Sequence, residues 1–485
     1  MQKYEHAFGK NDIRGIYGED ITEELYYALG RGYTNYLKTK SGLNSEKIWI
    51  TVARDARLHS PSLAKALIDG ILSTGSNVVD LGLAPTPIGY YSEAKGIPSE
   101  IINGGKITGA AIITASHNPK EYNGLKMTYS GCTLNESEIK EVKELTFKEL
   151  SVSKVSACGI LKTYDLISDY IKDMIERFGN KCEGVSVVVD SANATGGLVG
   201  PKLYKKLGCK VTELFSEPDG NFPNHHPNPS IEKTLDTLKE TVVKTNSDVG
   251  IAYDGDSDRI GVIDNKGNYL TGDKLLLIYA QDLISDGLKP TVVSEVKCSQ
   301  VLFDTIDKLG GHSVMCKTGH GYIKGKMKET NAILAGEMSG HTFFKDRYYG
   351  FDDAVYAGCR ILEIIAKNKK INPEFTIQDM LKPFDEVYSS PEVRYPCPNE
   401  MKKTVLAKVQ EKVQSNKNIF GSEIKDIITL DGMRIVFEGG FALIRQSNTE
   451  PVFTLRFEAK TKDECDRFKN KMIEMLDSEL NSVNV

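Results

Sequence analysis

The chain has 485 residues, of which 40% are hydrophobic and 26% charged, and a formal net charge of −5 at pH 7. This length predicts three or four domains of about 100–150 residues, and the acidic balance argues against a nucleic-acid surface, which needs a basic stripe. With no apolar run near the ~20 residues of a membrane span, no secretory signal and no C-x-x-C pair, we expect a cytoplasmic protein without disulfides, zinc, nucleic-acid or membrane partners.

Strand-like runs alternate with helical periodicity through the first 370 or so residues, which is typical of mostly parallel βαβ folds. The predicted elements, in chain order, are a helix at 21–38, a strand at 48–53, a helix opening at Ser60-Pro61 with Ser60 as its N-cap, a strand at 110–114, a helix at 165–178, strands at 185–190, 249–253 and 291–295, and a helix at 351–367. After a proline-rich segment at 372–398, short strands at 434–437, 442–444 and 453–459 and a helix at 463–476 predict an α+β domain. The boundaries that follow are 1–157, 158–267, 268–384 and 385–485.

A serine follows the apolar run 110–114, in the sequence Thr114-Ala115-Ser116-His117-Asn118-Pro119. Ligands of open α/β sheets usually bind at the carboxyl ends of strands, so the Ser116 hydroxyl is a candidate nucleophile. A free serine needs a base or prior phosphorylation, and no G-x-S-x-G elbow supports an acyl-transfer triad. A simple turn is the alternative, because Asn and Pro are common in turns.

Three aspartates follow the apolar run 249–253 at alternate positions: Asp254, Asp256 and Asp258. This spacing can direct three carboxylate oxygens toward one hard cation, which suits Mg²⁺, whereas an EF-hand is excluded because its glycine and glutamate are missing. An acidic turn is the alternative, but three like charges so close repel one another unless something neutralises them. Arg259, next in the chain, fits a contact to phosphate.

Three later loops carry polar side chains suited to a sugar phosphate. The stretch 445–451 offers a guanidinium, hydroxyls, an amide and backbone N–H groups, which can hold a dianionic phosphate, although a polar hairpin turn is the alternative. In 336–341, Glu337 and Ser339 alternate onto one face, as if to bond vicinal sugar hydroxyls. The glycine-rich stretch 317–326 is not a Walker motif, but its basic helix entry can hold a phosphate.

In this order and spacing, the motifs resemble the α-D-phosphohexomutase superfamily, from Asp12-Ile13-Arg14-Gly15 to Arg445–Pro451. The resemblance implies a heart-shaped, four-domain α/β enzyme with an active site in a central cleft. Three α/β domains with mixed, mostly parallel sheets would be followed by a C-terminal α+β domain. In chain order the domains would contribute the phosphoserine loop, the metal-binding loop, the sugar-recognition loop and the phosphate-binding loop.

The same resemblance implies roles for individual residues. Ser116 would carry a phosphoryl group and would bind Mg²⁺ together with Asp254, Asp256 and Asp258. Lys126, His341 and Arg14 are the other catalytic candidates, and Lys126 or His341 would move the proton. The candidate substrate-binding residues are His117, Asn118, Arg259, Lys317, His320, Glu337, Ser339, Arg445, Ser447, Asn448 and Thr449.

The implied reaction interconverts hexose 1-phosphate and hexose 6-phosphate through a hexose 1,6-bisphosphate, which is both intermediate and activator, with Mg²⁺ stabilising charge. Met338 and the stretch 219–227 resemble the phosphomannomutase/phosphoglucomutase branch, so mannose and glucose phosphates are the expected substrates of a monomer or homodimer. Two alternatives remain. One is a haloacid-dehalogenase-like phosphatase with Asp254 as nucleophile, and the other is a non-catalytic sugar-phosphate sensor on the same fold.

Overall fold

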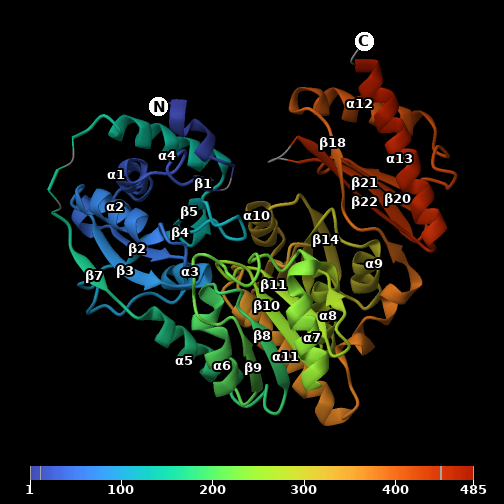
Figure 1. Cartoon of the computed structure of the whole chain (residues 1–485), viewed down its shortest axis with the longest axis horizontal. Coiled ribbons are helices and arrows are strands. Elements are labelled where there is room, and N and C mark those ends of the chain that lie inside the picture. Colours follow the sequence, from blue (N-terminus) through green and yellow to red (C-terminus); the bar gives the residue numbers. More distant parts are fainter. Residues whose placement is uncertain (1, 11, 154, 157, 448–450, 484–485) are drawn as a thin grey trace. The chain divides into compact units, whose positions relative to one another are not determined.

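A computed structural model describes residues 2–10, 12–153, 155–156, 158–447 and 451–483. Two compact units can be distinguished, and each is considered by itself (Figure 1). The first unit comprises Met1–Thr271 and Ser339–Thr376, and the second comprises Gly272–Met338 and Ile377–Val485. Short 3₁₀ helices lie at Gln2–Ala7, Ser45–Lys47, Thr195–Leu198, Glu232–Leu235, Ile377–Met380 and Lys382–Glu386.

The sheet that begins the first unit has the strand order β1-β5-β4-β2-β3-β7, with β6 paired to β5. Its strands are β1 (Ile13–Ile16), β2 (Trp49–Arg54), β3 (Asn77–Leu83), β4 (Ile107–Ile113), β5 (Tyr122–Tyr129), β6 (Cys132–Thr133) and β7 (Leu161–Thr163). β2 is parallel to β3 and β4, whereas β5 runs antiparallel to β4 and β1. The helices α1 (Glu23–Ser41), α2 (Ser60–Leu72) and α4 (Glu136–Glu149) pack together on one side, and α3 (Thr86–Ala94) lies on the other (Figure 1).

A second sheet of the first unit has the order β12-β11-β10-β8-β9. Its strands are β8 (Ser186–Asp190), β9 (Lys210–Leu214), β10 (Val249–Tyr253), β11 (Ile260–Asp264) and β12 (Tyr269–Leu270). The other elements of the first unit are α5 (Leu166–Phe178), α6 (Gly200–Lys206), α7 (Asp236–Thr245), β16 (Thr342–Phe344) and α11 (Ala354–Ile371). β10 is parallel to β8 and antiparallel to β11, so the loop between β10 and β11 leaves the carboxyl end of a buried strand.

The second unit contains parallel strands and an antiparallel sheet. β13 (Thr291–Glu295) lies between β14 (His312–Cys316) and β15 (Leu334–Gly336), with helices α8 (Gly272–Ser285), α9 (Gln300–Lys308) and α10 (His320–Thr330). The antiparallel sheet has the order β17-β22-β21-β20-β19, with β18 also paired to β22. Its elements are β17 (Tyr388–Ser389), β18 (Val393–Pro396), β19 (Asp426–Ile428), β20 (Met433–Phe437), β21 (Gly440–Gln446), β22 (Val452–Ala459), α12 (Asn399–Ser415) and α13 (Lys462–Val483).

The predicted class, three α/β domains with mixed sheets and a C-terminal α+β domain, is confirmed, and each predicted helix and strand is present, with shifted ends except for the strands at 249–253 and 291–295. One local prediction is wrong: His59, not Ser60, is the N-cap of α2. The Ser60 hydroxyl instead donates to Asp55 Oδ1 at 2.6 Å, because that buried carboxylate also needs a donor. The boundaries at 157, 267 and 384 stay predictions.

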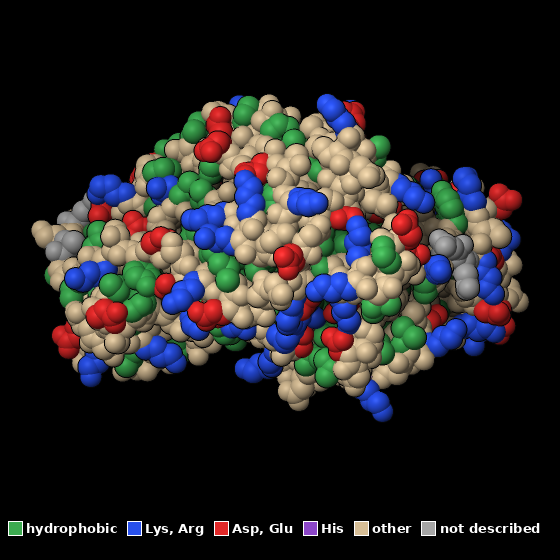
Figure 2. All heavy atoms as spheres, turned by 90° about the horizontal axis from the view of Figure 1, so that it is seen from below, with side chains coloured by type: hydrophobic (Ala, Val, Ile, Leu, Met, Phe, Trp, Pro, Cys, Tyr) green, Lys and Arg blue, Asp and Glu red, His purple; other side chains and the backbone are tan. Residues whose placement is uncertain are grey.

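Surface and covalent features are simple. Within the described residues, no helix is long and apolar enough to cross a membrane. All nine cysteines are free, and most are buried. On the face shown in Figure 2, Lys and Arg side chains are interspersed with Asp and Glu. Anionic ligands would therefore need local positive groups, which are found in the loops described next.

Candidate active site

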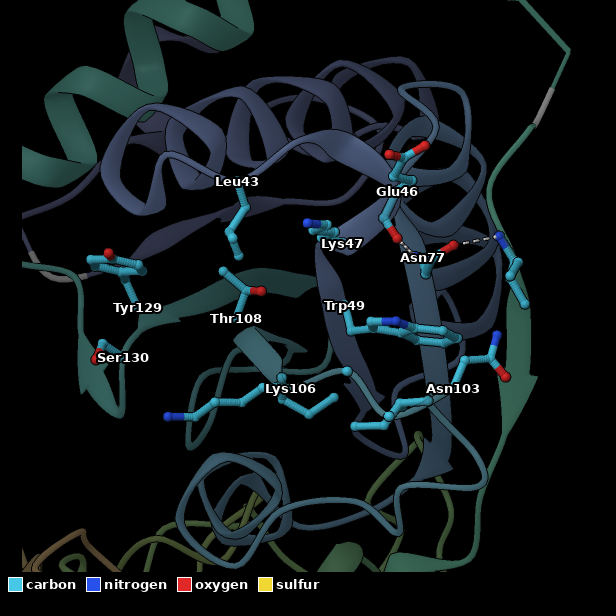
Figure 3. Close-up of a pocket in the computed structure, with 15 residues that line it drawn as sticks. Leu43, Glu46, Lys47, Trp49, Asn77, Asn103, Lys106, Thr108, Tyr129 and Ser130 are labelled. Atoms are coloured by element: carbon cyan, nitrogen blue, oxygen red, sulfur yellow. Dashed lines mark hydrogen bonds between the residues drawn. The ribbon is translucent and has the colours of Figure 1, made fainter.

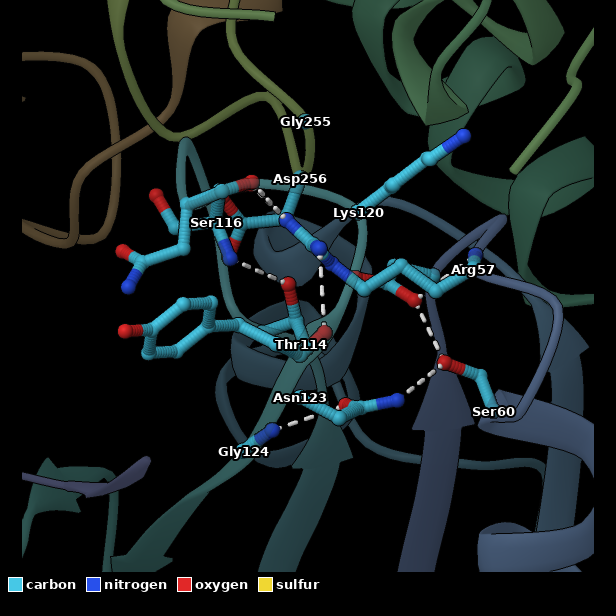
Figure 4. Close-up of polar contacts among 12 residues, drawn as sticks. Arg57, Ser60, Thr114, Ser116, Lys120, Asn123, Gly124, Gly255 and Asp256 are labelled. Carbon is cyan, nitrogen blue, oxygen red and sulfur yellow. Dashed lines mark hydrogen bonds and ion pairs between the residues drawn. The ribbon is translucent and has the colours of Figure 1, made fainter. Parts of the chain in front are cut away.

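Ser116 lies in the turn that follows β4, in a backbone conformation that is unusual for a residue other than glycine. Its φ is +50°, in the left-handed region, which costs a non-glycine residue about 1–2 kcal/mol. Its N–H donates to Thr114 Oγ1 at 2.8 Å, its Oγ donates to Asp254 Oδ2 at 2.6 Å, and its carbonyl oxygen accepts from Arg57 Nη2 at 2.9 Å. Ser116 is only 2% exposed, so its hydroxyl is fixed against the aspartate loop (Figure 4).

The three aspartates are buried in the β10–β11 loop, and one oxygen from each lies within 4.8 Å of the others. Lys126 of β5 donates from Nζ to Asp256 Oδ2 at 2.6 Å and to Asp258 Oδ2 at 2.5 Å. The other oxygens, Asp256 Oδ1 and Asp258 Oδ1, are buried and have no hydrogen-bond partner among the described residues. Unsatisfied buried carboxylate oxygens are the donor set that Mg²⁺ prefers, so these residues fit a divalent cation.

Mutual charge sets the protonation of this cluster. Burial, together with the charges of Asp256 and Asp258, raises the pKa of Asp254 well above its usual value. Burial disfavours the ammonium form of Lys126, but Asp256 and Asp258 outweigh it and raise the pKa of Lys126. Burial would raise the pKa of Asp256, yet Lys126 lowers it below its usual value. A cation between these carboxylates is thus favoured electrostatically.

His341 borders the aspartates from the segment before β16. Its Nε2 accepts from Arg259 Nε at 3.0 Å, and its Nδ1 lies 3.2 Å from Asp352 Oδ2 and 3.7 Å from Asp258 Oδ1. Burial would lower the pKa of His341, but Asp258 and then Asp352 raise it, despite Arg259. The carboxylates therefore favour a proton on Nδ1, which suits a group that must hold and release one.

Arg14 of β1 and the residues after Ser116 complete this first group. Arg14 Nη1 donates to Asn118 Oδ1 at 2.8 Å, and Nη2 donates to Asp12 Oδ2 at 2.5 Å. His117 Nδ1 lies 3.2 Å from Ser116 Oγ. Burial, followed by Arg259 and Arg14, holds the pKa of His117 well below its usual value, so this imidazole is neutral near pH 7. Guanidinium groups near a serine hydroxyl suit a phosphoryl group.

A second group of predicted residues lies in the second unit. Glu337, just after β15, is buried, and its Oε1 accepts from the Gly319 N–H at 2.6 Å. Gly319 is the N-cap of α10, whose first residue is His320, so Glu337 and His320 are brought close together. Lys317, in the loop before α10, is exposed. Ser339 belongs to the first unit and is half-buried.

Asp431 joins this loop to the last domain. Its Oδ2 accepts from the Thr318 N–H at 3.1 Å and from Arg445 Nε at 3.2 Å. Arg445 ends β21, and Ser447 is held between β21 and β22 by its N–H bond to Val452 at 3.0 Å. The structure thus places Arg445 beside the Lys317–His320 loop. The predicted ligands Asn448 and Thr449 lie outside the described residues.

Several residues that the sequence did not single out take part in the first group. Thr86, at the start of α3, donates from Oγ1 to Asp256 Oδ2 at 2.5 Å. Arg57, after β2, binds the backbone of the Ser116 loop, and Asp352 faces His341. Arg57 and Thr86 follow parallel strands of the first sheet, so polar residues at the carboxyl ends of β2 and β3 were the available signal.

A pocket of about 590 Å³ lies at the amino-terminal ends of β2 and β4 in the first sheet (Figure 3). Its walls include Trp49, Lys106 and Tyr129. The buried Asn77 side chain in its wall is spent on backbone groups, since Nδ2 donates to Glu46 at 2.7 Å and Oδ1 accepts from Ile160 at 3.0 Å. This pocket is separate from the Ser116 and aspartate loops, which follow the carboxyl ends of β4 and β10.

Comparisons with known proteins cover almost the whole chain. The phosphoglucomutase/phosphomannomutase family models match in order: alpha/beta/alpha domain I at residues 5–153, domain II at 168–267, domain III at 271–384 and the C-terminal domain at 392–475. A phosphomannomutase/phosphoglucomutase of Pseudomonas aeruginosa is 37% identical over 462 residues, which are 95% of this chain and 93% of that protein.

Two further relatives agree with these matches. A phosphoglucomutase of Neisseria gonorrhoeae is 36% identical over 97% of this chain and 96% of its own length. The crystal structure of a phosphoglucomutase/phosphomannomutase family protein from Burkholderia thailandensis superposes with a TM-score of 0.86 at 33% identity, covering 98% of this chain and 97% of that one. The similarity therefore extends through all four domains in both sequence and fold.

Proposed function

The chain belongs to the phosphoglucomutase/phosphomannomutase family, and on that premise we propose that it interconverts hexose 1-phosphates and hexose 6-phosphates. The observation that carries the proposal is the 2.6 Å hydrogen bond between Ser116 Oγ and Asp254 Oδ2. It joins a buried hydroxyl to a cluster of carboxylates with unsatisfied oxygens. Such an arrangement suits a serine that carries a phosphoryl group beside a divalent cation.

In the proposed reaction, O6 of a hexose 1-phosphate attacks the phosphorus of phosphorylated Ser116. A P–O6 bond forms, the bond from phosphorus to Ser116 Oγ breaks, and the product is a hexose 1,6-bisphosphate. The O6 proton passes to a protein base, for which His341 is the candidate, because the carboxylates of Asp256 and Asp258 keep Lys126 in its ammonium form. The bisphosphate then turns over so that its O1 phosphate faces Ser116. Ser116 Oγ attacks this phosphorus, the P–O1 bond breaks, and the base returns the proton to O1, which gives the 6-phosphate and restores phosphorylated Ser116.

Asp254, Asp256 and Asp258, with Ser116, would hold Mg²⁺. When bound, the ion neutralises charge on the transferring phosphoryl group. Lys126 and Arg259 add fixed positive charge in the same cluster, as their contacts with Asp256 and His341 indicate. Arg14 and Asn118, which are hydrogen-bonded to each other, keep the polar side of the Ser116 turn ordered.

The groups suited to the sugar and to a phosphate that does not react belong to the second unit, except for Ser339. Glu337, with Ser339, is proposed to accept hydrogen bonds from the O3 and O4 hydroxyls, which glucose and mannose share. Lys317, His320, Arg445 and Ser447 are proposed to contact phosphate. A site that makes no contact at C2 discriminates poorly there, so both sugars should be substrates.

A coupled assay with glucose 1-phosphate, mannose 1-phosphate and a trace of glucose 1,6-bisphosphate tests the proposal. Formation of 6-phosphates without free inorganic phosphate is the expected result. Stoichiometric phosphate release would instead support the phosphatase with Asp254 as nucleophile, and ligand binding without turnover would support the sensor. Intact-mass analysis should further find one phosphate per chain, located on Ser116 by peptide mapping.

A further inference from the structure

Arg57 is a buried arginine whose two Nη atoms donate hydrogen bonds to one short stretch of backbone, between Ser116 and Tyr122. It lies in the loop after β2 and is 1% exposed. Nη2 donates to the carbonyl oxygens of Ser116 at 2.9 Å and Asn118 at 2.6 Å. Nη1 donates to the carbonyl oxygens of Pro119 at 2.5 Å and Tyr122 at 3.0 Å. Figure 4 shows the guanidinium directed into the turn that carries Ser116.

The arginine is itself anchored on its other sides. Arg57 Nε donates to Asp55 Oδ2 at 3.0 Å, and Ser60 Oγ donates to Asp55 Oδ1 at 2.6 Å. The ring of Phe222 lies 5.4 Å from the guanidinium carbon, within the range of a cation–π contact. A planar fork with five donors, fixed on three sides, can hold several carbonyls in one geometry, which a lysine ammonium cannot do.

The Ser116 carbonyl that Arg57 holds also faces the aspartate loop. A Cβ atom placed on Gly255 would lie 2.3 Å from that oxygen, so the backbones of the two loops are in close contact there. The position of this carbonyl therefore sets the approach of the serine turn to Asp254 and Asp256. The left-handed φ of +50° at Ser116 is costly without such support.

We propose that Arg57 is a positioning residue for phosphoryl transfer, which holds the Ser116 turn so that Oγ stays aimed at the aspartate cluster. The inference rests on the proposed mutase function and deepens it. It states that Arg57 keeps Ser116 Oγ in position by bonding the backbone of the turn, without contacting the substrate itself. A small misplacement of a reacting atom slows a reaction steeply, so the effect should fall on kcat.

The test compares Arg57→Lys with Arg360→Lys in the full-length protein. Arg360, in α11, is also 1% exposed and pairs with Asp346 at 2.7 Å, so it controls for loss of a buried guanidinium. In Arg57→Lys, kcat should fall at least about 100-fold while KM for glucose 1-phosphate changes less than about threefold. The rate at which glucose 1,6-bisphosphate phosphorylates Ser116, followed by intact mass, should fall in parallel. Arg360→Lys should keep kcat within about threefold.

Hydrogen–deuterium exchange separates this inference from the proposed function. Amides of the 114–122 segment should exchange faster in Arg57→Lys and not in Arg360→Lys, whether or not the wild-type protein is a mutase. An inactive wild type would refute the mutase function alone, whereas unchanged exchange, or a folded Arg57→Lys with kcat within threefold of wild type, would overturn the role of Arg57. If Arg57→Lys does not fold, Asp55→Asn replaces it, with an expected fall in kcat of about tenfold, and unchanged kcat there overturns the proposal.

Discussion

The two groups of candidate residues differ in how firmly the protein holds them. In the first unit, Ser116, Lys126 and the aspartates are each at most 4% exposed, and short hydrogen bonds join them. In the second unit, Lys317 is exposed, His320 is half-buried, and Arg445 contacts the partly exposed Asp431. Transfer of a phosphoryl group needs preorganised charges, whereas groups that hold a sugar must also let it go. Ser116, Lys126 and the aspartates are therefore all buried, whereas the second group combines the buried Glu337 and Arg445 with the exposed Lys317.

Ser116→Ala should give the largest effect, because it removes the covalent carrier from the firmly held group. We expect kcat to fall at least about a thousandfold, or about 4 kcal/mol at 1.36 kcal/mol per tenfold, with sugar-phosphate affinity nearly unchanged. Steady-state kinetics and calorimetry measure the two quantities. Ser92→Ala is the control, since it removes a buried hydroxyl bonded to Thr51 at 2.7 Å and should leave kcat unchanged. Substantial turnover by Ser116→Ala would show that Ser116 is not the covalent carrier and that the buried group is not the one needed for the reaction.

Removal of the metal should come next in size. Chelation with EDTA should abolish turnover and Mg²⁺ should restore it, while Asp256→Asn should raise the Mg²⁺ concentration needed for half-maximal activity by about 100-fold through loss of an anionic ligand. Asp69→Asn, at a site 44% exposed in an ion pair with Lys65, is the charge-matched control and should behave as wild type. Full activity after exhaustive chelation would show that the aspartates serve another purpose.

Glu337→Ala tests the second group. A lost hydrogen bond to a charged group costs about 1.5–3 kcal/mol, so kcat/KM should fall about 10- to 150-fold for glucose 1-phosphate and mannose 1-phosphate alike. Glu329→Ala, whose side chain is 65% exposed, should change neither value. A wild-type preference beyond about a thousandfold for one sugar, or a loss confined to one sugar, would show that another contact reads C2.

The smallest expected effect concerns the free energy of unfolding and comes from the pair His225 and Asp190 in the first unit, which is separate from Ser116 and the three aspartates. His225 Nε2 lies 3.0 Å from Asp190 Oδ2. Burial disfavours the imidazolium, but Asp190 outweighs it and raises the pKa of His225. Because the folded-state pKa is raised, the pair stabilises fully below the unfolded pKa of about 6.5 and loses this contribution as pH rises through the folded value.

Accordingly, His225→Gln should lower the free energy of unfolding by about 1 kcal/mol more at pH 5.5 than at pH 8.5, the scale of one hydrogen bond. Urea denaturation at the two pH values measures the difference, with kcat at pH 7.5 expected to change little. Equal destabilisation at both pH values would mean that the imidazole is not charged in the folded protein.

Secondary structure was predicted correctly where the residues of a single segment were sufficient to identify it. The apolar run 249–253 became β10 unchanged, and 291–295 became β13, because buried strands read as uninterrupted hydrophobic runs. Ser60 shows the limit. Its sequence pattern predicted an N-cap, but its hydroxyl instead donates a hydrogen bond to Asp55, a buried carboxylate five residues earlier. Local propensity is weak when a buried charge competes for the same donor.

The sequence by itself placed the Ser116 and aspartate motifs directly after buried strands, because uninterrupted hydrophobic runs mark such strands, and its motifs resembled the family that the comparisons show. Only the tertiary structure decided which charges meet: Lys126 lies 130 residues from Asp256, and Arg57 lies 59 from Ser116. Such pairings leave no local pattern, since they depend on which strands become neighbours in a sheet. The same packing that buries these side chains makes each unpaired charge costly, so partners distant in sequence are held together.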